Sequence, residues 1–246
     1  MKLKGKRVVV TGGGGTLGTV LIPILKDLGA TVQAPSHQEL PVDSPEAVAS
    51  FFTAGPGLSC DLVVHLASFT DVPGAQFRHN HSRAISTNIF GTAALASWTK
   101  ERKIKMVYIS TDYVYEGTSG GYSASGPTQP TTFYGFTKLA GECYLTGNDL
   151  IIRTSFVPRG YWGKGEGQHT KVFNNVYTSK DWVDIIAGKI AESIEMGDVG
   201  IVNIGTEKKT LKDLAVQEYP EVEEVEVESF NLGYRYPTDT SMNLDI

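Results

Sequence analysis

The sequence has few cysteines, no long apolar run and no excess of basic residues. Its two cysteines, Cys60 and Cys143, are too far apart for a CxxC redox or zinc motif. The histidines show no metal-ligand spacing, so we expect no metal site. With 22 Lys and Arg against 27 Asp and Glu, the chain lacks the basic footprint of nucleic-acid binding. No stretch approaches the roughly 18 apolar residues of a membrane span. We therefore expect a cytoplasmic protein with neither a nucleic-acid nor a membrane partner.

Short apolar strands alternate with helical stretches along much of the 246-residue chain. Val-rich runs without strict alternation are typical of strands buried on both faces of a parallel sheet. Repeated strand–helix–strand order predicts an α/β fold, a doubly wound parallel sheet with helices on both faces. The predicted strands are 7–10, 30–34, 61–66, 105–110, 150–153 and 200–204. The predicted helices are 16–28, 45–53, one within 76–102, 133–145, 181–195 and 211–217. Residues 158–170 are expected to form a loop at the mouth of a site, and 221–228 a half-exposed strand.

A glycine-rich loop directly follows the first predicted strand. Its sequence, TGGGGTLG, places Gly12, Gly15 and Gly18 at a GxxGxxG spacing. Gly12 can form the tight turn, Gly15 lets the backbone approach a pyrophosphate, and Gly18 lets the following helix pack close to the strand. The N-terminus of that helix, at Thr16 and Leu17, adds amide donors and positive potential. Such a loop between a strand and a helix predicts a dinucleotide cofactor.

The end of the second predicted strand bears on the choice between NADH and NADPH. An NAD-preferring site usually offers an acidic residue there for the ribose hydroxyls, but no Asp or Glu occurs between Asp27 and Glu39. Ser36 and His37 could hydrogen-bond a 2′-phosphate instead, although no Arg or Lys is there to pair with it. The sequence therefore favours NADPH, with NADH as the alternative.

Tyr134 and Lys138 lie four residues apart near the start of a predicted helix, so the phenol and the ammonium can share one helix face. Lowering the pKa of a phenol from about 10 to about 7 requires about 4 kcal/mol. One positive charge ~4 Å away, at an effective dielectric constant of ~20, supplies roughly that amount. Upstream, a predicted strand ends in Ser110 and Thr111, at the sheet edge where open α/β folds bind ligands. We expect Thr111 to orient a substrate carbonyl and Tyr134 to protonate its oxygen as hydride arrives. Lys138 would lower the pKa of Tyr134 and hold the cofactor ribose.

Six segments carry a family resemblance: TGGGGTLG, HLASFTDV (65–72), TNIFGTAALA (87–96), VYISTDYVYEG (107–117), PTTFYGFTKLAGE (130–142) and IIRTSF (151–156). Together with the tail YRYPTDTSMNLD (234–245), they resemble extended short-chain dehydrogenases/reductases, most closely the dTDP-4-dehydrorhamnose reductase family. The resemblance runs nearly end to end. It implies a Rossmann-type fold and an NAD(P)H-dependent reductase of a nucleotide-linked 4-keto-6-deoxy sugar. It also implies a catalytic triad of Thr111, Tyr134 and Lys138.

The resemblance implies roles for further residues. Ala67, Ser68 and Phe69 would line the cofactor, and Val42 would lie beside the adenine. Thr111, Asp112 and Phe156 would approach the sugar together with Tyr134. Asn88 takes the place of a helix asparagine near such sites, or else only organises the backbone.

Two departures from the family bear on the substrate. Pro41 stands where the family commonly has an Asp beside the adenine pocket. The stretch between Phe156 and Tyr177 is much shorter than in the family. The sugar-binding lobe is therefore expected to be small and its pocket open.

The sequence thus predicts two parts. Residues 1–155 would form the dinucleotide-binding core with the catalytic residues. Residues 156–246 would form a reduced substrate-binding region interleaved with the last core elements. Two alternatives to the sugar reductase stay open. One is an extended reductase or epimerase acting on another nucleotide sugar, and the other is a non-catalytic NADP-binding regulatory subunit, resembling that of methionine adenosyltransferase. Besides a nucleotide-sugar substrate, a second copy in a homodimer is compatible with the sequence.

Overall fold

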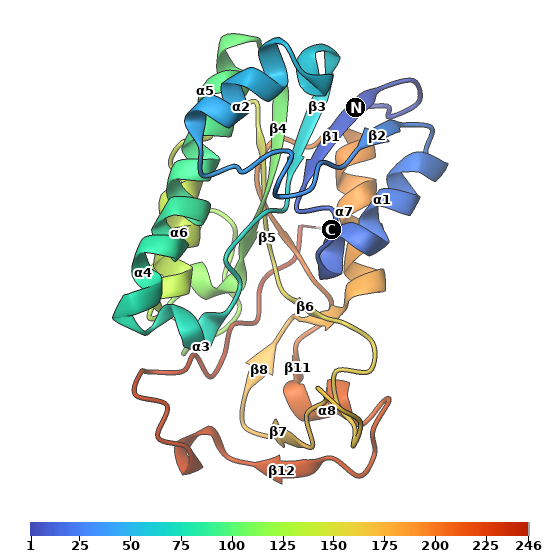
Figure 1. The fold of residues 1–246 in the computed structure, drawn as a ribbon. Helices are drawn as coiled ribbons and strands as arrows, with labels where there is room; N and C mark the ends of the chain where they lie inside the picture. Colours follow the sequence, from blue (N-terminus) through green and yellow to red (C-terminus); the bar gives the residue numbers. More distant parts are fainter. Residues whose placement is uncertain (246) are drawn as a thin grey trace.

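A computed structural model describes residues 1–245. Its central sheet has six parallel strands in the order β10-β5-β4-β3-β1-β2, drawn in Figure 1 with their carboxyl ends toward the bottom of the view. The strands are β1 (Arg7–Thr11), β2 (Thr31–Gln33), β3 (Leu62–His65), β4 (Lys105–Thr111), β5 (Leu150–Thr154) and β10 (Gly200–Ile204). The predicted doubly wound α/β fold is confirmed, and each of the six strands falls within two residues of its expected position.

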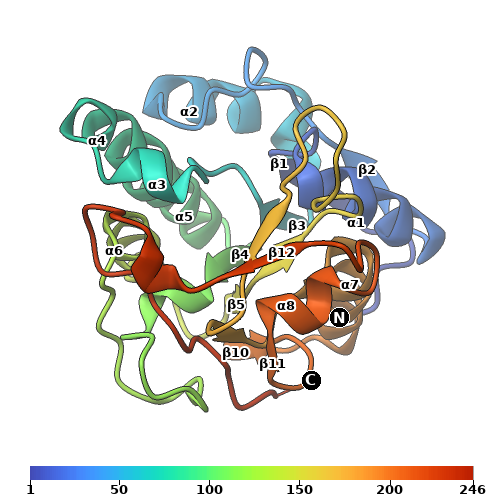
Figure 2. The ribbon, with the colours of Figure 1, turned by 90° about the horizontal axis from the view of Figure 1, so that it is seen from below.

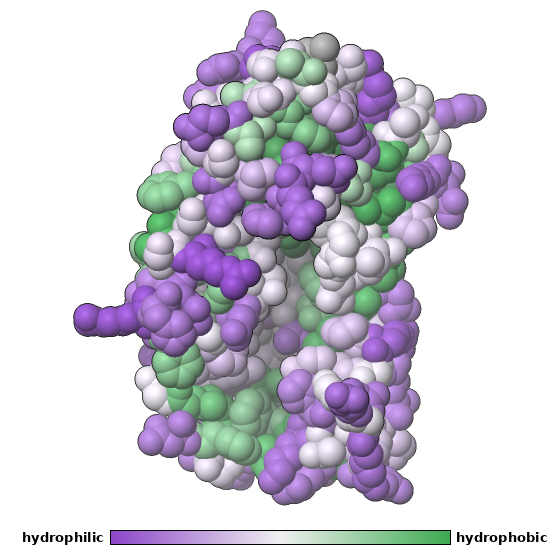
Figure 3. Space-filling view, in the orientation of Figure 1, coloured by the Kyte–Doolittle hydropathy of each residue, from purple (hydrophilic) through white to green (hydrophobic). Residues whose placement is uncertain are grey.

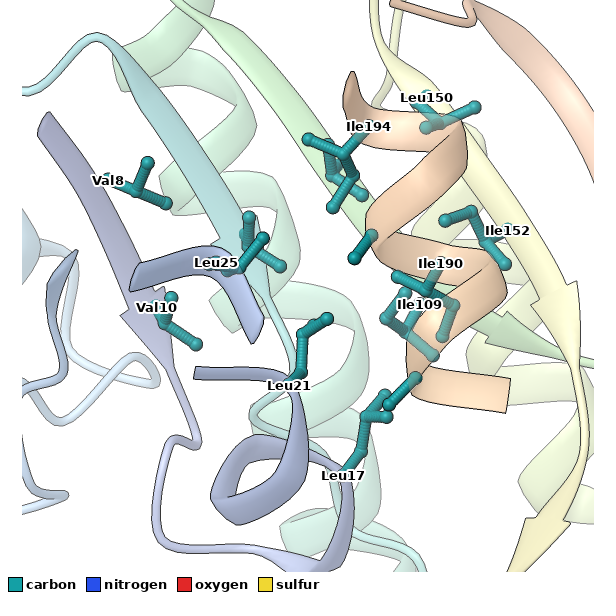
Figure 4. Close-up of a cluster of buried hydrophobic side chains, with 14 of the residues drawn as sticks. Val8, Val10, Leu17, Leu21, Leu25, Ile109, Leu150, Ile152, Ile190 and Ile194 are labelled. Atoms are coloured by element: carbon teal, nitrogen blue, oxygen red, sulfur yellow. The ribbon is translucent and has the colours of Figure 1, made fainter. Parts of the chain in front are cut away.

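Helices cover both faces of this sheet (Figure 1). On one face lie α1 (Thr16–Asp27) and α7 (Val183–Met196). Their apolar side chains meet alternate strand residues such as Val8, Val10 and Ile152 in one buried cluster (Figure 4). On the other face, Val9, Val63 and Tyr108 pack against α2 (Pro45–Thr53) and α5 (Thr92–Glu101) in a second cluster. Because both sets of strand side chains are buried, the strands show no polar alternation.

The long helix expected within 76–102 contains an irregular turn. It consists of α4 (Arg78–Ile85), a π-helical stretch (Ser86–Gly91) and α5, after the short α3 (Val72–Ala75). A π turn inserts one extra residue into the helical repeat. Here that turn carries Asn88, of which 1% is exposed. Next to it on the same face lies α6 (Phe133–Glu142).

A small lobe lies below the carboxyl ends of the strands. Three two-stranded pairs build it, together with α8 (Leu211–Ala215) and a buried cluster of its own. The pairs are β6 (Phe156–Val157) with β9 (Asp181–Trp182), β7 (Lys171–Phe173) with β12 (Glu223–Val225), and β8 (Tyr177–Thr178) with β11 (Lys209–Thr210). Figure 2, seen from below, shows α8 and β12 across the ends of β4 and β5. The strand expected at 221–228 is shorter than predicted, because a 3-10 turn begins at Val227.

The chain ends in an extended segment between lobe and core. In this segment Thr240 donates its amide to Tyr177 in the lobe, and Asp239 donates its amide to Gly117 after β4. Three 3-10 turns complete the elements: Pro56–Ser59, Asp112–Val114 and Val227–Ser229. Within residues 1–245, no helix has both the length and the apolar character of a membrane span. The predicted division at residue 155 stays a prediction, and residue 246 lies outside the described part of the chain.

Candidate active site

The strand order reverses at β1, and two loops meet there. The chain passes from β1 to β2 on one side and returns to β3 on the other, which creates the type of crevice in which open α/β sheets bind ligands. Gly12 adopts a positive φ of 70°, and a Cβ there would lie 2.6 Å from the amide nitrogen of Ala67. A Cβ on Gly18 would lie 2.5 Å from the carbonyl oxygen of Gly13. Both glycines are therefore required by close backbone approach.

The residues at the start of α1 fit a diphosphate. Gly15 is the N-cap, no side chain caps the helix, and no acidic residue lies in its first turn. A Cβ on Gly14 would meet nothing within 4 Å. The positive end of the helix dipole, with the amides of Thr16 and Leu17, is thus left for an anion. Figure 3 shows a hollow on this face of the molecule, below the sheet.

The turn after β2 carries one carboxylate. Ser36 and His37 are exposed, and Ser36 donates its amide to the Glu39 carboxylate over 2.8 Å. Hydrogen bonds from the Ser36 amide and hydroxyl lower the pKa of Glu39. Val42 is 3% exposed. It packs closely on Gly91, where an added Cβ would lie 3.0 Å from the Val42 side chain.

Asn88 joins the loop after β3 to helix α6. Its Oδ1 accepts from the Phe69 amide (2.7 Å) and from the Ser68 hydroxyl (2.9 Å). Its Nδ2 donates to the Phe69 carbonyl (3.1 Å) and to the Thr137 hydroxyl (2.9 Å). All four contacts fix the backbone and hydroxyls around the crevice. Of the two roles considered for Asn88, the structure shows the organising one.

His65 at the end of β3 ties the same loops together in its neutral form. Burial lowers the pKa of His65 to about 3, and Lys138 acts in the same direction. Thr92 donates its hydroxyl to the Asn88 carbonyl (2.8 Å), so its oxygen accepts from Nε2 of His65 at 3.1 Å. Nδ1 must then accept from the Thr11 hydroxyl at 2.7 Å. The network therefore assigns the Nε2–H tautomer, and one neutral ring links β1 and β3 to the start of α5.

Tyr134 lies near Thr111, Ser68 and Asp112. Burial and the charge of Asp112 raise the pKa of Tyr134, while the hydroxyls of Thr111 and Ser68 oppose that shift. Thr111 itself donates to Asp112 Oδ1 (3.1 Å) and accepts from the Tyr113 amide (3.2 Å). The structure thus places Thr111 and Tyr134 in one neighbourhood, beside a loop residue expected to line the cofactor.

Lys138 lies one turn further along α6, and its charge differs from the expectation. Its Nζ is 4.1 Å from the centroid of the Tyr108 ring, and burial lowers the pKa of Lys138 to about 7 against the opposing effect of Glu142. The expected ammonium is therefore not permanent: Lys138 carries the positive charge that would stabilise a phenolate only below its lowered pKa.

Asp112 and Phe156, both expected to approach the sugar, follow the ends of β4 and β5. Asp112 is 1% exposed, and burial raises its pKa while Lys180 and the hydroxyls of Thr240, Thr111 and Ser155 oppose that shift. Phe156 is half-buried against the first core cluster. Sequence reasoning missed Thr240 and Lys180. The tail motif around Thr240 was the available signal for the first, whereas nothing in the sequence pointed to Lys180.

Fold and site together define a Rossmann-type α/β protein of the short-chain dehydrogenase/reductase class. Within that class the chain belongs to the family described as the RmlD substrate binding domain, whose model matches residues 6–199.

Similar proteins include dTDP-4-dehydrorhamnose reductases. That of Mycolicibacterium smegmatis is 28% identical over 205 residues, 81% of this chain and 59% of that protein. That of Aggregatibacter actinomycetemcomitans is 28% identical over 210 residues, 83% of this chain and 68% of that protein. For three of the first four such relatives, the matched part is 53–59% of their length. The solved Bacillus anthracis dTDP-4-dehydrorhamnose reductase in complex with NADP has the same fold, with a TM-score of 0.84 at 22% identity. That match covers 98% of this chain and 91% of that one.

Proposed function

We propose that this protein is an NADPH-dependent reductase of a nucleotide-linked 4-keto-6-deoxy sugar, with NADH as the alternative cofactor. The observation that carries the proposal is the placement of Thr111 at the end of β4 near Tyr134, which lies one turn from Lys138 on α6, at the crevice where the glycine loop approaches the loop after β3. The names of the relatives supply the substrate class, dTDP-4-dehydrorhamnose and related keto sugars.

The chain's own residues can carry the proton chemistry. When bound, a reduced nicotinamide supplies the hydride. Thr111 can turn its hydroxyl from Asp112 to the substrate carbonyl oxygen, and Tyr134 is within hydrogen-bonding reach of the same point. Tyr134 donates the proton to that oxygen, and a protonated Lys138 stabilises the phenolate that remains. Gly12 to Leu17 would hold the cofactor diphosphate, while Ser36 and His37 would face its adenosine ribose.

The test is reduction of a dTDP-4-keto-6-deoxyhexose, followed by loss of the NADPH absorbance at 340 nm. Tyr134→Phe should abolish turnover and leave the Kd for NADPH nearly unchanged, because only the transferable proton is removed. Tyr144→Phe is the matched control, since Tyr144 is exposed beyond the end of α6 and should react as the unaltered protein does. Equal turnover of Tyr134→Phe would refute the assignment.

The assay also separates the alternatives. Turnover only with another nucleotide sugar would favour a different extended reductase or epimerase. Tight NADPH binding without turnover on a panel of keto sugars would favour a non-catalytic regulatory subunit. The cytoplasmic location, the homodimer and the lack of a nucleic-acid partner stay predictions from the sequence.

A further inference from the structure

A cavity of about 430 Å³ lies within the lobe. The lobe itself lies below the carboxyl ends of the central strands (Figure 1). The volume of the cavity is in the range of small-molecule sites. Its walls combine aromatic and aliphatic side chains with polar ones, and two of the polar side chains are lysines. The residues that concern the argument are Tyr161, Phe173, Phe230, Tyr236, Lys171 and Lys180.

The two lysines of this cavity differ in their partners. Lys171 forms an ion pair with Glu223 at 2.9 Å. For Lys180, no carboxylate of residues 1–245 lies within 4.0 Å of Nζ. Its backbone is fixed between β8 and β9, where its amide donates to the Thr178 hydroxyl over 2.9 Å. Burial lowers the pKa of Lys180, and the charge of Asp112 only partly opposes this.

The acidic group whose charge acts on Lys180 is already engaged. Asp112 accepts from Thr111 at one oxygen (3.1 Å) and from Thr240 at the other (2.7 Å). A partly buried ammonium without a close anion is unfavourable for the protein alone. A cation already held at the wall of a cavity is a favourable partner for an anionic ligand. Its side chain then needs little further ordering when the ligand binds.

The cavity lies next to the candidate active site. Tyr236 lines the cavity, and its hydroxyl is 3.2 Å from that of Tyr113. The Tyr113 ring in turn packs edge-on against Tyr134, with the centroids 6.2 Å apart. Lys180, which also lines the cavity, acts on Asp112, the residue after Thr111. Two side chains of the cavity wall are thus linked to residues beside the candidate catalytic hydroxyls.

We propose that Lys180 binds the diphosphate of the nucleotide-sugar substrate and that the aromatic walls hold the adjoining nucleoside. The inference rests on the proposed function for the identity of the ligand. Lys180 thereby places the sugar against Thr111 and Tyr134, and the lobe needs no second cation for the diphosphate.

Titration calorimetry with dTDP, with UDP as a diphosphate of another base, tests the proposal on the full chain. Lys180→Met should weaken binding of the diphosphates at least tenfold and leave thymidine binding within twofold. Lys212→Met is the control, because Lys212 carries the same charge in the same lobe but is paired with Glu224 at 2.7 Å. Its affinity for dTDP should match that of the unaltered protein.

A variant that keeps the charge separates a direct contact from a structural role. Lys180→Arg should retain most of the dTDP affinity that Lys180→Met loses, because a guanidinium carries the same positive charge.

Unchanged dTDP affinity in Lys180→Met, or no diphosphate binding by the unaltered protein, would overturn the inference, even if the keto sugar is reduced. Lys180-dependent binding without turnover of any keto sugar would instead support the anion site and refute the proposed reductase.

Discussion

Thr240 donates a hydrogen bond of 2.7 Å to Asp112, which lies 128 positions earlier in the chain. Both side chains are buried. The other Asp112 oxygen accepts from Thr111, so the C-terminal segment reaches the candidate catalytic hydroxyl through one carboxylate. Thr240 is thus a positioning residue, which acts on Thr111 through Asp112.

Replacing Thr240 by Val should lower kcat about tenfold, because Asp112 loses a donor and competes more strongly for the Thr111 hydroxyl that has to turn to the substrate. The change keeps the shape of the side chain. Thr240→Ser, which retains the hydroxyl, should restore most of the rate, and steady-state kinetics of the two variants make the comparison. If Val and Ser variants are equally active, Asp112 does not depend on this bond.

The pH dependence of kcat/KM should show the titration of Lys138. The pKa of Lys138 is about 7, and the protonated form is the one that stabilises the phenolate. The rate should therefore be highest below pH 7 and fall toward tenfold per unit above it, since kcat/KM follows the groups of the free enzyme. Lys138→Arg should be slower but lack this decline up to pH 9. A flat profile in the unaltered protein from pH 6 to 9 would contradict the assignment.

Arg153 and Glu142 form a buried ion pair at 2.7 Å, and Ser110 also donates to Glu142. Arg153→Met should lower the free energy of unfolding by about 3–5 kcal/mol, because a buried carboxylate loses its charge partner. The double change Arg153→Met with Glu142→Leu should recover much of the loss. Urea titrations provide the measurement.

The control for that pair lies on the surface. Arg159 pairs with Asp184 at 2.9 Å, and both side chains are about half exposed. Arg159→Met should change the unfolding free energy by less than about 1 kcal/mol. If the Arg153 and Arg159 variants lose equal unfolding free energy, burial does not determine how much an ion pair contributes to stability.

Glu39 should discriminate against the 2′-phosphate of NADPH. Its carboxylate is held at the turn after β2 by Ser36, so Glu39→Gln should strengthen NADPH binding relative to NADH by about fivefold at low salt. The ratio of the two dissociation constants, measured by fluorescence titration, is the readout. Because the turn is exposed, the difference should shrink in 1 M salt. An unchanged ratio would place the 2′-phosphate elsewhere.

The sequence allowed the sheet and the hydroxyl pair to be predicted, because both rest on local signals. Buried strands such as Val8–Val10 stand out by composition, and a hydroxyl at a strand end needs only the strand to be located. The charge of Lys138 could not be foreseen in this way. It depends on burial and on Glu142 and Tyr108, which only the packed helix and strand bring together.

The lobe was equally beyond local prediction. Strands of two or three residues, such as β6 and β8, carry too few side chains to show a period, and their partners lie far along the chain. Lys180 resembles any surface lysine in the sequence. Its isolation from carboxylates arises only when β8, β9 and the C-terminal segment enclose it.

Because of the π turn around Asn88, the helical segment from α4 to α5 cannot lose a residue without changing which side chains face the sheet. Removing one residue between Ser86 and Gly91 would leave a regular α-helix, but everything beyond it would rotate by about 100° relative to what precedes it. Leu95 and Trp98 would then turn off the sheet, or else Asn88 would leave the crevice. Core packing and loop organisation are thus set by a single residue count, and natural insertions or deletions in this segment should come only in lengths that preserve both.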